Sequence, residues 1–585
     1  IDDTGTGNLN IRATSLAFLN AAGDKYYAGF TNGGGSELFY NGSKKFETST
    51  TGITVTGTVN GIPFYSDGTS MYTHDVSGTD NVASRNTAYG FVAMDAITTG
   101  DDNTAVGYNA GTQINTGADN TVIGAYAGDA LTSGGDNVAI GKSALSTEDA
   151  HGRNVAVGAQ ALQNQNASAN AYNVAVGFQS GLNVTTGTSN TSLGGLSGDS
   201  LTTGSNNTAL GYASLSTSLD GDHNTAIGVY ALEDYEDGDG NGFNTAVGSQ
   251  SQAQATTGEF NTSLGASSMG VGVTTGDYNV ALGYKAGEDL TSANTTTLVG
   301  AFAGLNLTSG TNNTAVGYAA LATENAHGHN TAVGYAALNY LDAGADGYNV
   351  AVGSNAGGAM TTGIENTLIG SLAGDALTTG GGNIAIGHQA LSASVDGYFN
   401  TAVGHLALQD YEDGDGNGHN TAIGASSQLN ASTGEFNTSL GSLSMGVGVA
   451  TGNDNVALGY KAGKTITSGQ RNAFIGSNAG DAVTTSSYNV GVGYGALSAE
   501  DTHGKNVAIG YQALVVQNAG QDAYNVAIGF EAGQLTTTAI KNTLVGGNAG
   551  DAITEGGFNV ALGYDALGAN TIGNSNVAIG ETALA

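Results

Sequence analysis

The sequence contains no cysteine and no tryptophan, a single proline, Pro63, and only 11% charged residues. Without cysteine the chain has no disulfide, no thiolate nucleophile and no cysteine-based zinc or iron–sulfur site. The single proline excludes a collagen triple helix, which needs many prolines and a Gly-X-Y period. Globular domains contain roughly 25% charged residues, so this composition is unlike that of an ordinary enzyme.

Basic side chains are also scarce. The 13 Lys and Arg residues stand against 49 Asp and Glu, which gives a formal net charge of −36. Such a surface repels a phosphate backbone, so we expect no nucleic-acid partner. No apolar run approaches the roughly 18 residues that a membrane-spanning helix requires, so no membrane span is expected.

Glycine and small apolar residues dominate what is present. Glycine accounts for 97 of 585 residues, and hydrophobic residues for 39%. A chain with this much Ala, Val, Ile and Leu can bury a core, which disfavours the disorder typical of polar low-complexity sequences. We therefore expect an ordered but repetitive structure.

A pentad of the form Asn-[Thr/Val]-[small]-[Val/Ile/Leu]-Gly recurs 29 times between Asn86 and Asn576, and its fifth position is Gly in every copy. The asparagine is replaced once, by Thr296, and the branched fourth residue once, by Tyr89. Most copies follow the preceding one after about 17 residues, and a fixed period of this kind is the signature of a solenoid or another repeat array.

This short unit is nested in a longer repeat. Asn103, Asn279 and Asn455 are equally spaced along the chain, and each interval between them contains ten short units. The pattern therefore divides the chain into a strand-rich segment, 1–85, and a repeat region, 86–585, with super-repeats 103–278, 279–454 and the incomplete 455–585.

Short strands explain the unit better than helices do. Four or five β-branched or small residues bounded by Asn and Gly suit a strand, and a Gly in every unit opposes a helix. The predicted unit is strand, turn, short strand and loop, with the Gly supplying a positive φ or a close backbone approach. We predict an all-β, parallel β-solenoid or β-roll whose 29 coils, at about 4.8 Å each, would span roughly 140 Å. The pentad asparagines would form a ladder of side-chain amides.

The pattern also predicts which strand faces are buried. The Val, Ile or Leu at position four is expected to point into the coil, and the mostly Ala position three to lie on the opposite face. Two apolar faces on so thin a coil imply burial against another chain, and hence a homotrimeric fibre. A wider single-chain solenoid is the alternative.

The recurring A-[VIL]-G-x-x-[AS] motif resembles the head of YadA-type trimeric adhesins, and this resemblance covers Asn86 to Ala585. It implies a left-handed parallel β-roll assembled as a homotrimer. The coils of that family are typically shorter, so the longer loops here are a departure.

The segment 1–85 is similar to stalk units in tail fibres of marine bacteriophages, through the phrases YNGSKKFET and TGITVTGTV. This resemblance implies a fibre whose N-terminal side faces a virion or tail component. The chain begins at Ile1 and stops at Ala585 inside a repeat unit, so we expect it to be a processed or partial segment, with more chain or a docked subunit after Ala585.

Two acidic loops are candidate calcium sites. EDYEDGDGNG begins at Glu233, and the near copy QDYEDGDGNG begins at Gln409. Their alternating oxygen ligands follow the opening of a calcium loop, but the bidentate Glu expected at loop position twelve is missing. A solvated acidic turn is therefore the favoured alternative. The candidate ligands are Asp237, Asp239, Asn241, Asp413, Asp415 and Asn417.

Histidines in AHG or THG loops recur at the interval of the longer repeat, as His151, His327 and His503. We see no carboxylate or nucleophile partner at a fixed offset and interpret them as turn residues rather than metal ligands. Acidic pairs such as Glu148 and Asp149 are reminiscent of glycosidase carboxylates, but they follow loops rather than a pocket. We expect no enzymatic activity.

A row of tyrosines directly follows the pentad Gly. Packing between coils or chains is the favoured role of these rings, and stacking on cell-surface sugars is the alternative. The residues are Tyr108, Tyr212, Tyr284, Tyr318, Tyr335, Tyr460, Tyr494, Tyr511 and Tyr564.

These features together predict a structural or adhesive fibre: the shaft of a phage tail fibre or similar virion fibre that projects a receptor-binding tip for host attachment. Its partners would be further copies of itself, a virion component and a host glycan or protein receptor. It would act outside the cell, on the virion surface. A bacterial trimeric surface adhesin or an extracellular filament subunit is the alternative.

Overall fold

The computed structural model describes residues 13–31, 35–41, 43–49, 52–55, 58–59, 62–63, 65–66, 70–73, 82–236, 240–412 and 417–585. The chain forms two compact units, one of Ile1–Tyr230 with Glu236–Asn241 and the other of Ala231–Tyr235 with Gly242–Ala585. All regular structure in the described residues is strand, and none of it is helix. A helix that could cross a membrane is accordingly absent from this described part of the chain.

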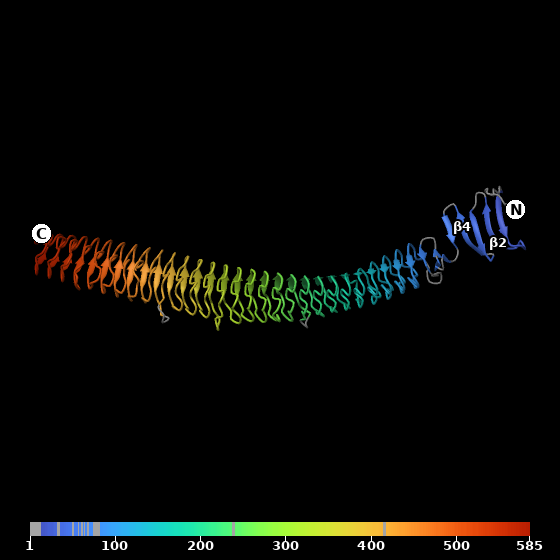
Figure 1. Ribbon diagram of the computed structural model, residues 1–585, viewed down its shortest axis with the longest axis horizontal. Coiled ribbons are helices and arrows are strands. Elements are labelled where there is room, and N and C mark those ends of the chain that lie inside the picture. Colours follow the sequence, from blue (N-terminus) through green and yellow to red (C-terminus); the bar gives the residue numbers. More distant parts are fainter. Residues whose placement is uncertain are drawn as a thin grey trace, which may run out of the picture. The chain divides into compact units, whose positions relative to one another are not determined.

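The first unit begins with an antiparallel sheet in the order β1-β2-β3-β4-β5, and strands β2 and β4 are marked in Figure 1. The pair β6-β7 is also antiparallel, and so is the pair β8-β9. The bounds are β1 (Ser15–Leu19), β2 (Tyr26–Thr31), β3 (Ser36–Tyr40), β4 (Ser43–Ser49), β5 (Gly52–Val55), β6 (Thr58–Val59), β7 (Ile62–Pro63), β8 (Tyr65–Ser66) and β9 (Met71–Tyr72).

The same unit continues as a parallel stack in which each three-residue strand pairs in register with the next, starting from β9 with β10. The strands are β10 (Thr87–Tyr89), β11 (Thr104–Val106), β12 (Thr121–Ile123), β13 (Val138–Ile140), β14 (Val155–Val157), β15 (Val174–Val176), β16 (Thr191–Leu193), β17 (Thr208–Leu210) and β18 (Thr225–Ile227).

The second unit is a parallel stack of the same kind, and within it the coils follow one another in sequence order (Figure 1). Its strands are β19 (Thr245–Val247), β20 (Thr262–Leu264), β21 (Val280–Leu282), β22 (Thr297–Val299), β23 (Thr314–Val316), β24 (Thr331–Val333), β25 (Val350–Val352), β26 (Thr367–Ile369), β27 (Ile384–Ile386), β28 (Thr401–Val403), β29 (Thr421–Ile423), β30 (Thr438–Leu440), β31 (Val456–Leu458), β32 (Ala473–Ile475), β33 (Val490–Val492), β34 (Val507–Ile509), β35 (Val526–Ile528), β36 (Thr543–Val545), β37 (Val560–Leu562) and β38 (Val577–Ile579). The predicted all-β parallel β-solenoid with coils of about 17 residues is confirmed.

The pentad asparagines form the predicted ladder, and they are buried. Asn103 accepts a hydrogen bond on its side-chain oxygen from the backbone N–H of Asn120, at 3.1 Å, and its Nδ2 donates to the carbonyl of Gly117, at 2.9 Å. The Asn103 side chain thus links its own coil to the following strand and closes its own loop. This satisfies backbone groups that the short strands leave without partners.

The pentad glycine has both properties that the sequence predicts. At Gly107 φ is 139°, a backbone conformation that side chains with a Cβ rarely adopt. A Cβ at this position would also lie 2.6 Å from the carbonyl oxygen of Gly124 in the next coil. Only glycine allows the coils to approach this closely at the corner.

The short second strand predicted within each coil is absent from the described coils. The residues after the pentad Gly form a turn instead, with φ of 56° at Asn109 and 57° at Gly111. Positive φ values at alternating positions break the extended conformation of a strand. The turn backbone still bonds to the next coil, as in Gly111 N–H to Ala127 O at 2.9 Å.

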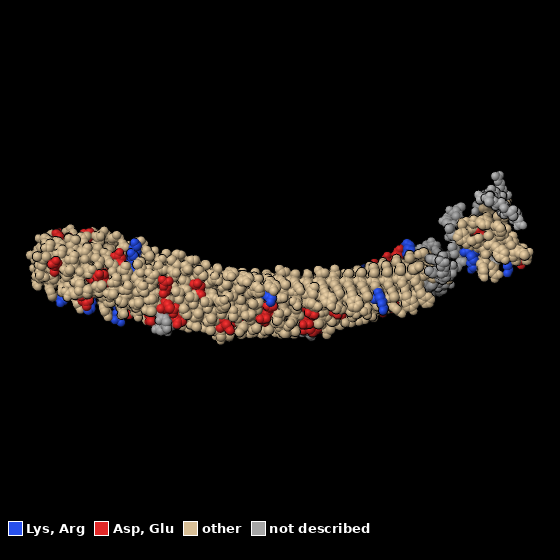
Figure 2. All heavy atoms as spheres, in the orientation of Figure 1, with Lys and Arg blue, Asp and Glu red and all other residues tan. Residues whose placement is uncertain are grey.

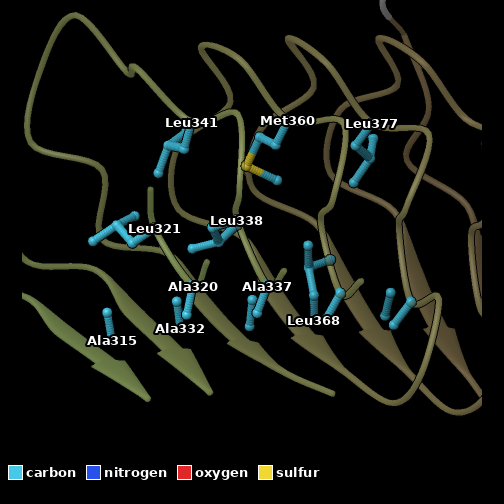
Figure 3. Close-up of a cluster of buried hydrophobic side chains, with 14 of the residues drawn as sticks. Ala315, Ala320, Leu321, Ala332, Ala337, Leu338, Leu341, Met360, Leu368 and Leu377 are labelled. Carbon is cyan, nitrogen blue, oxygen red and sulfur yellow. The ribbon is translucent and has the colours of Figure 1, made fainter. Parts of the chain in front are cut away.

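The prediction of which strand face is buried is wrong. Position three, usually Ala, lies inside the coil and is buried in every repeat strand, whereas positions two and four point outward. Figure 3 shows Ala315 and Ala332 of neighbouring strands facing Ala320 and Ala337 of the turns, with Leu321, Leu338 and Leu341 across the interior. The small residue faces inward because the leucines that reach in from the other side of the coil already fill the space.

The interior also accepts larger side chains at position three, as at Leu368, whose in-register neighbours are Ala351 and Ala385. Phe474, at position three of β32, is fully buried. Its in-register partner in β33 is Gly491 rather than Ala, and a Cβ there would lie 2.9 Å from the Phe474 ring. The exchange of volume between adjacent coils keeps the packing density constant.

We predict that Asn366→Ala destabilises the solenoid locally. The Asn366 oxygen accepts from the N–H of Asn383 at 3.0 Å, and its Nδ2 donates to Gly380 O at 2.9 Å. Leaving these buried groups without partners costs about 1–3 kcal/mol each. Hydrogen exchange followed by mass spectrometry should show faster exchange in the coils around residue 366.

Asn306→Ala is the matched control, because this asparagine is exposed in the same unit. Equal protection in the two variants would contradict a structural role for the ladder.

Candidate functional site

The outward face of the repeat strands carries a row of branched apolar side chains from position four. Because the strands pair in register, these residues line up, as in Leu264, Leu282 and Val299 of β20, β21 and β22. Leu264 is 51% exposed, Leu440 48% and Ile475 41%. We call this row of position-four residues the outer apolar row. Exposed apolar arrays of this kind are candidate interaction surfaces.

Charged groups are sparse and scattered over the molecule. On the face shown in Figure 2, acidic and basic side chains are separated by large areas formed by other residues. Position two adds Thr or Val beside the outer apolar row. Uncharged side chains of position two therefore flank the row.

The tyrosines that follow the pentad Gly are 43% to 56% exposed. Several stack on the ring of the neighbouring coil, as between Tyr318 and Tyr335 at 5.5 Å and 8°, and between Tyr494 and Tyr511 at 5.5 Å and 14°. Packing between coils is thus confirmed for these pairs. Each ring covers part of the face of its neighbour. The stacked tyrosines therefore present mainly their ring edges and hydroxyl groups to solvent.

A second aromatic row was not predicted from the sequence. It occupies the residue directly before the pentad Asn, as in Phe243, Phe260 and Tyr278, whose successive ring centroids lie 5.1 and 5.0 Å apart. Elsewhere in this row a cation lies over a ring, as Lys505 does over Tyr524 at 5.1 Å. The signal in the sequence is an aromatic or cationic residue at a fixed offset of −1 from the Asn.

Four of the six predicted calcium ligands, Asp237, Asp239, Asp413 and Asp415, lie outside the described residues, and the prediction stays untested. The flanks of the loops are described. The buried Tyr411 donates its hydroxyl hydrogen to the backbone oxygen of Asn417 at 3.0 Å, and Asn241 lies at the equivalent position of the first loop. Glu412 accepts from the N–H of Val395 at 2.6 Å, so one acidic residue of this segment has a structural partner.

The histidine loops contain a carboxylate at a fixed offset, which the sequence reasoning overlooked. Glu148, Glu324 and Glu500 precede the three histidines by three residues and are fully buried. Glu148 Oε1 accepts from the N–H of His151 at 3.0 Å, and Oε2 accepts from the N–H of Ala167 at 3.3 Å. The expectation that these histidines have no carboxylate partner at a fixed offset is therefore wrong, whereas all three histidines lie in loops as expected.

Two of these loops bring three metal-ligating side chains together. Glu148, Asp149 and His151 have ligand atoms within 4.8 Å of one another, and so do Glu324, His327 and Asp342. The Nδ1 atom of the imidazole lies 3.8 Å from Glu148 Oε1 in the first loop and 3.4 Å from Glu324 Oε1 in the second. Burial raises the pKa of both glutamates.

The third loop differs at one residue. Thr502 replaces the alanine that precedes the histidine, and its hydroxyl lies 2.9 Å from His503 Nδ1. Burial raises the pKa of Glu500 to about 7, and neighbouring Asp501 and Asp522 add to the effect. Without an imidazole facing it, this carboxylate is costly to ionise.

No protein-family model matches the chain, and a search of curated proteins returns no match.

We predict that Glu500→Gln makes its loop more stable at pH 8 but has little effect at pH 4. The unfolded chain releases this proton near the ordinary pKa of 4.5, whereas the folded chain holds it to about 7. In the wild-type chain, the loop therefore loses stability as pH rises from about 4.5 to about 7, because the buried Glu500 carboxyl must ionise. Hydrogen exchange of the segment 498–506 in both proteins, at both pH values, measures the difference.

Glu555→Gln, at an exposed site in the same unit, is the control. A Glu500→Gln effect of equal size at pH 4 and pH 8 would contradict the assignment of the buried carboxyl as the titrating group.

Proposed function

We propose that this chain is a structural and adhesive fibre protein: the shaft of a phage tail fibre or a similar virion fibre, built as a homotrimer. The observation that carries the proposal is the combination of a purely repetitive solenoid with the outer apolar row. Within each unit, a stack of near-identical coils extends in one direction and offers the same surface at every level. This architecture suits spacing and anchoring better than it suits chemistry on a small substrate.

The outer apolar row supports the proposed self-association. A partner that covers it must present apolar groups at the strand spacing of about 4.8 Å along a parallel ladder. Another copy of this chain carries such a surface. The first sheet adds to the argument, because Tyr27 is 55% and Tyr40 75% exposed there. Three copies, rather than two, are proposed from the resemblance to trimeric adhesin heads.

The mechanism of such a fibre is mechanical and positional. Backbone ladders and buried apolar rows supply rigidity without disulfides, and the fibre holds a receptor-binding tip away from the particle. We place the virion component at the N-terminal side, and the host glycan or protein receptor at a region outside this chain. The proposed location is extracellular, and the proposed role is non-enzymatic. An acidic surface suits a salty medium, where a short Debye length screens repulsion between copies.

The second candidate is a bacterial trimeric surface adhesin or an extracellular filament subunit with the same solenoid. The resemblance of the repeat region to adhesin heads favours it. The tail-fibre phrases in the segment 1–85 favour the virion fibre.

The first test is the native mass by light scattering. A homotrimer is expected to have three times the chain mass of 57.7 kDa. A monomeric mass would overturn the assembly and leave a single-chain solenoid.

We predict that charge in the outer apolar row dissociates the assembly. The double variant Val352→Glu, Ile369→Glu changes two adjacent outward residues that are 36% and 38% exposed. Burying two carboxylates in an apolar interface is costly, so the scattering mass should fall threefold while circular dichroism still shows β structure. Thr362→Glu, in an exposed loop of the same coil, should leave the mass unchanged.

The two candidate functions are separated by immunogold labelling. Antibodies against the purified chain should label the tails of virions in the source material. Labelling of bacterial cell surfaces alone would contradict the virion fibre and support the adhesin.

A further inference from the structure

The loops around His151 and His327 are built alike, although they belong to different copies of the longer repeat. In each loop a fully buried glutamate lies beneath a partly exposed histidine, and an aspartate completes the group. Both glutamates also hold the loop backbone: Glu324 accepts from the N–H of His327 at 3.1 Å and from that of Ala343 at 3.2 Å. These bonds fix the carboxylates in one orientation.

The hydrogen bonds within the loops leave ligand capacity unused. A carboxylate has about four lone-pair sites, and backbone N–H groups occupy only some of them. The Nδ1 atoms of His151 and His327 are buried and form no hydrogen bond in the described structure. Each nitrogen faces the glutamate at 3.8 or 3.4 Å, which is too long for a good hydrogen bond.

These separations fit two ligands of one metal ion. Zinc binds His nitrogen at about 2.0–2.1 Å and carboxylate oxygen at about 2.0–2.2 Å, so two tetrahedral ligands lie about 3.4 Å apart. Burial of an ionised carboxylate is costly unless a cation compensates it. Among the ion pairs of the described residues, neither Glu148 nor Glu324 is matched with a lysine or arginine.

The two loops differ in where their aspartate lies: it is in the loop itself in the first copy and in the following coil in the second. The first loop has Asp149, with Asn166 in the following coil; the second has Asn325 at the first place and Asp342 at the second. Each loop therefore keeps one Asp beside its Glu and His.

We propose that the loops around His151 and His327 each bind one divalent transition-metal cation such as Zn²⁺ through the Glu carboxylate, the imidazole Nδ1 and one Asp carboxylate. Water completes the coordination, as in zinc sites with three protein ligands. The imidazole selects this class of ion over Ca²⁺ and Mg²⁺, which prefer oxygen ligands. The ion at His327 ties its loop to Asp342 of the following coil, whereas the ion at His151 is held within one loop. This inference is independent of the proposed fibre function.

The third loop is a natural negative control. Thr502 engages His503 Nδ1, and the three ligand atoms are not brought together there as they are in the other two loops. The alanine that precedes the histidine in the other loops leaves Nδ1 facing the glutamate. We therefore expect the wild-type chain to bind two ions, and Thr502→Ala to bind a third.

The experiment is isothermal titration of chelator-treated full-length chain with Zn²⁺, with the bound metal counted by mass spectrometry. Two ions per chain are expected, and the double variant His151→Ala, His327→Ala should lose both. These partly exposed imidazoles can be removed without emptying the core, so the fold should persist by circular dichroism. His503→Ala should leave the count unchanged.

Three outcomes would overturn the proposal. They are no Zn²⁺ binding by the wild-type chain, an unchanged count in the double histidine variant, and equal binding of Ca²⁺ at the same loops. If Thr502→Ala binds one ion more than the wild-type chain, this gain would support the proposal, because the substitution removes no proposed metal ligand.

Discussion

Every other feature of the solenoid depends on the in-register parallel pairing of coil on coil. Parallel pairing places each residue beside the equivalent residue of the next coil. Side chains at the same position of the repeat unit therefore form a row along the solenoid. Asn103 lies above Asn120 and forms a buried amide ladder, and Gly107 lies above Gly124 and allows the corners to approach. A strand of three residues is marginal alone, and it is stable here because every neighbour repeats it.

The narrow interior follows from the same constraint. Position three is usually small because the leucines of the facing turn fill the coil, and the large Phe474 at this position lies beside Gly491 in the next strand. The larger Val, Ile and Leu side chains are consequently directed outward. The solenoid thus displays the Val, Ile and Leu residues of position four on its surface, which is the physical basis for proposing that copies of the chain assemble around this face.

The histidine loops are where chemistry can collect, although their coils have the ordinary length of 17 residues, as from Asn137 to Asn154. The buried Glu148 and Glu324 orient the backbone of the loop that contains the histidine, so one side chain serves both the fold and the proposed metal site. Glu500 serves the fold in the same way, but a single hydroxyl, that of Thr502, redirects the imidazole. The longer repeat therefore contains three copies of one loop, and the substitution at Thr502 changes the contacts of the histidine in the third copy.

The sequence by itself determined the period, the parallel solenoid, the asparagine ladder and the corner glycines, because each follows from one residue type at a fixed spacing. It did not determine which strand face is inside, since Ala at position three and Val at position four are both apolar and alternate with equal regularity. It also did not reveal that Glu148 is buried beneath His151, or that an aromatic row precedes the asparagines. Those features were decided by the tertiary structure, because the cross-section of a coil and the residues of adjacent coils determine which side chains have room.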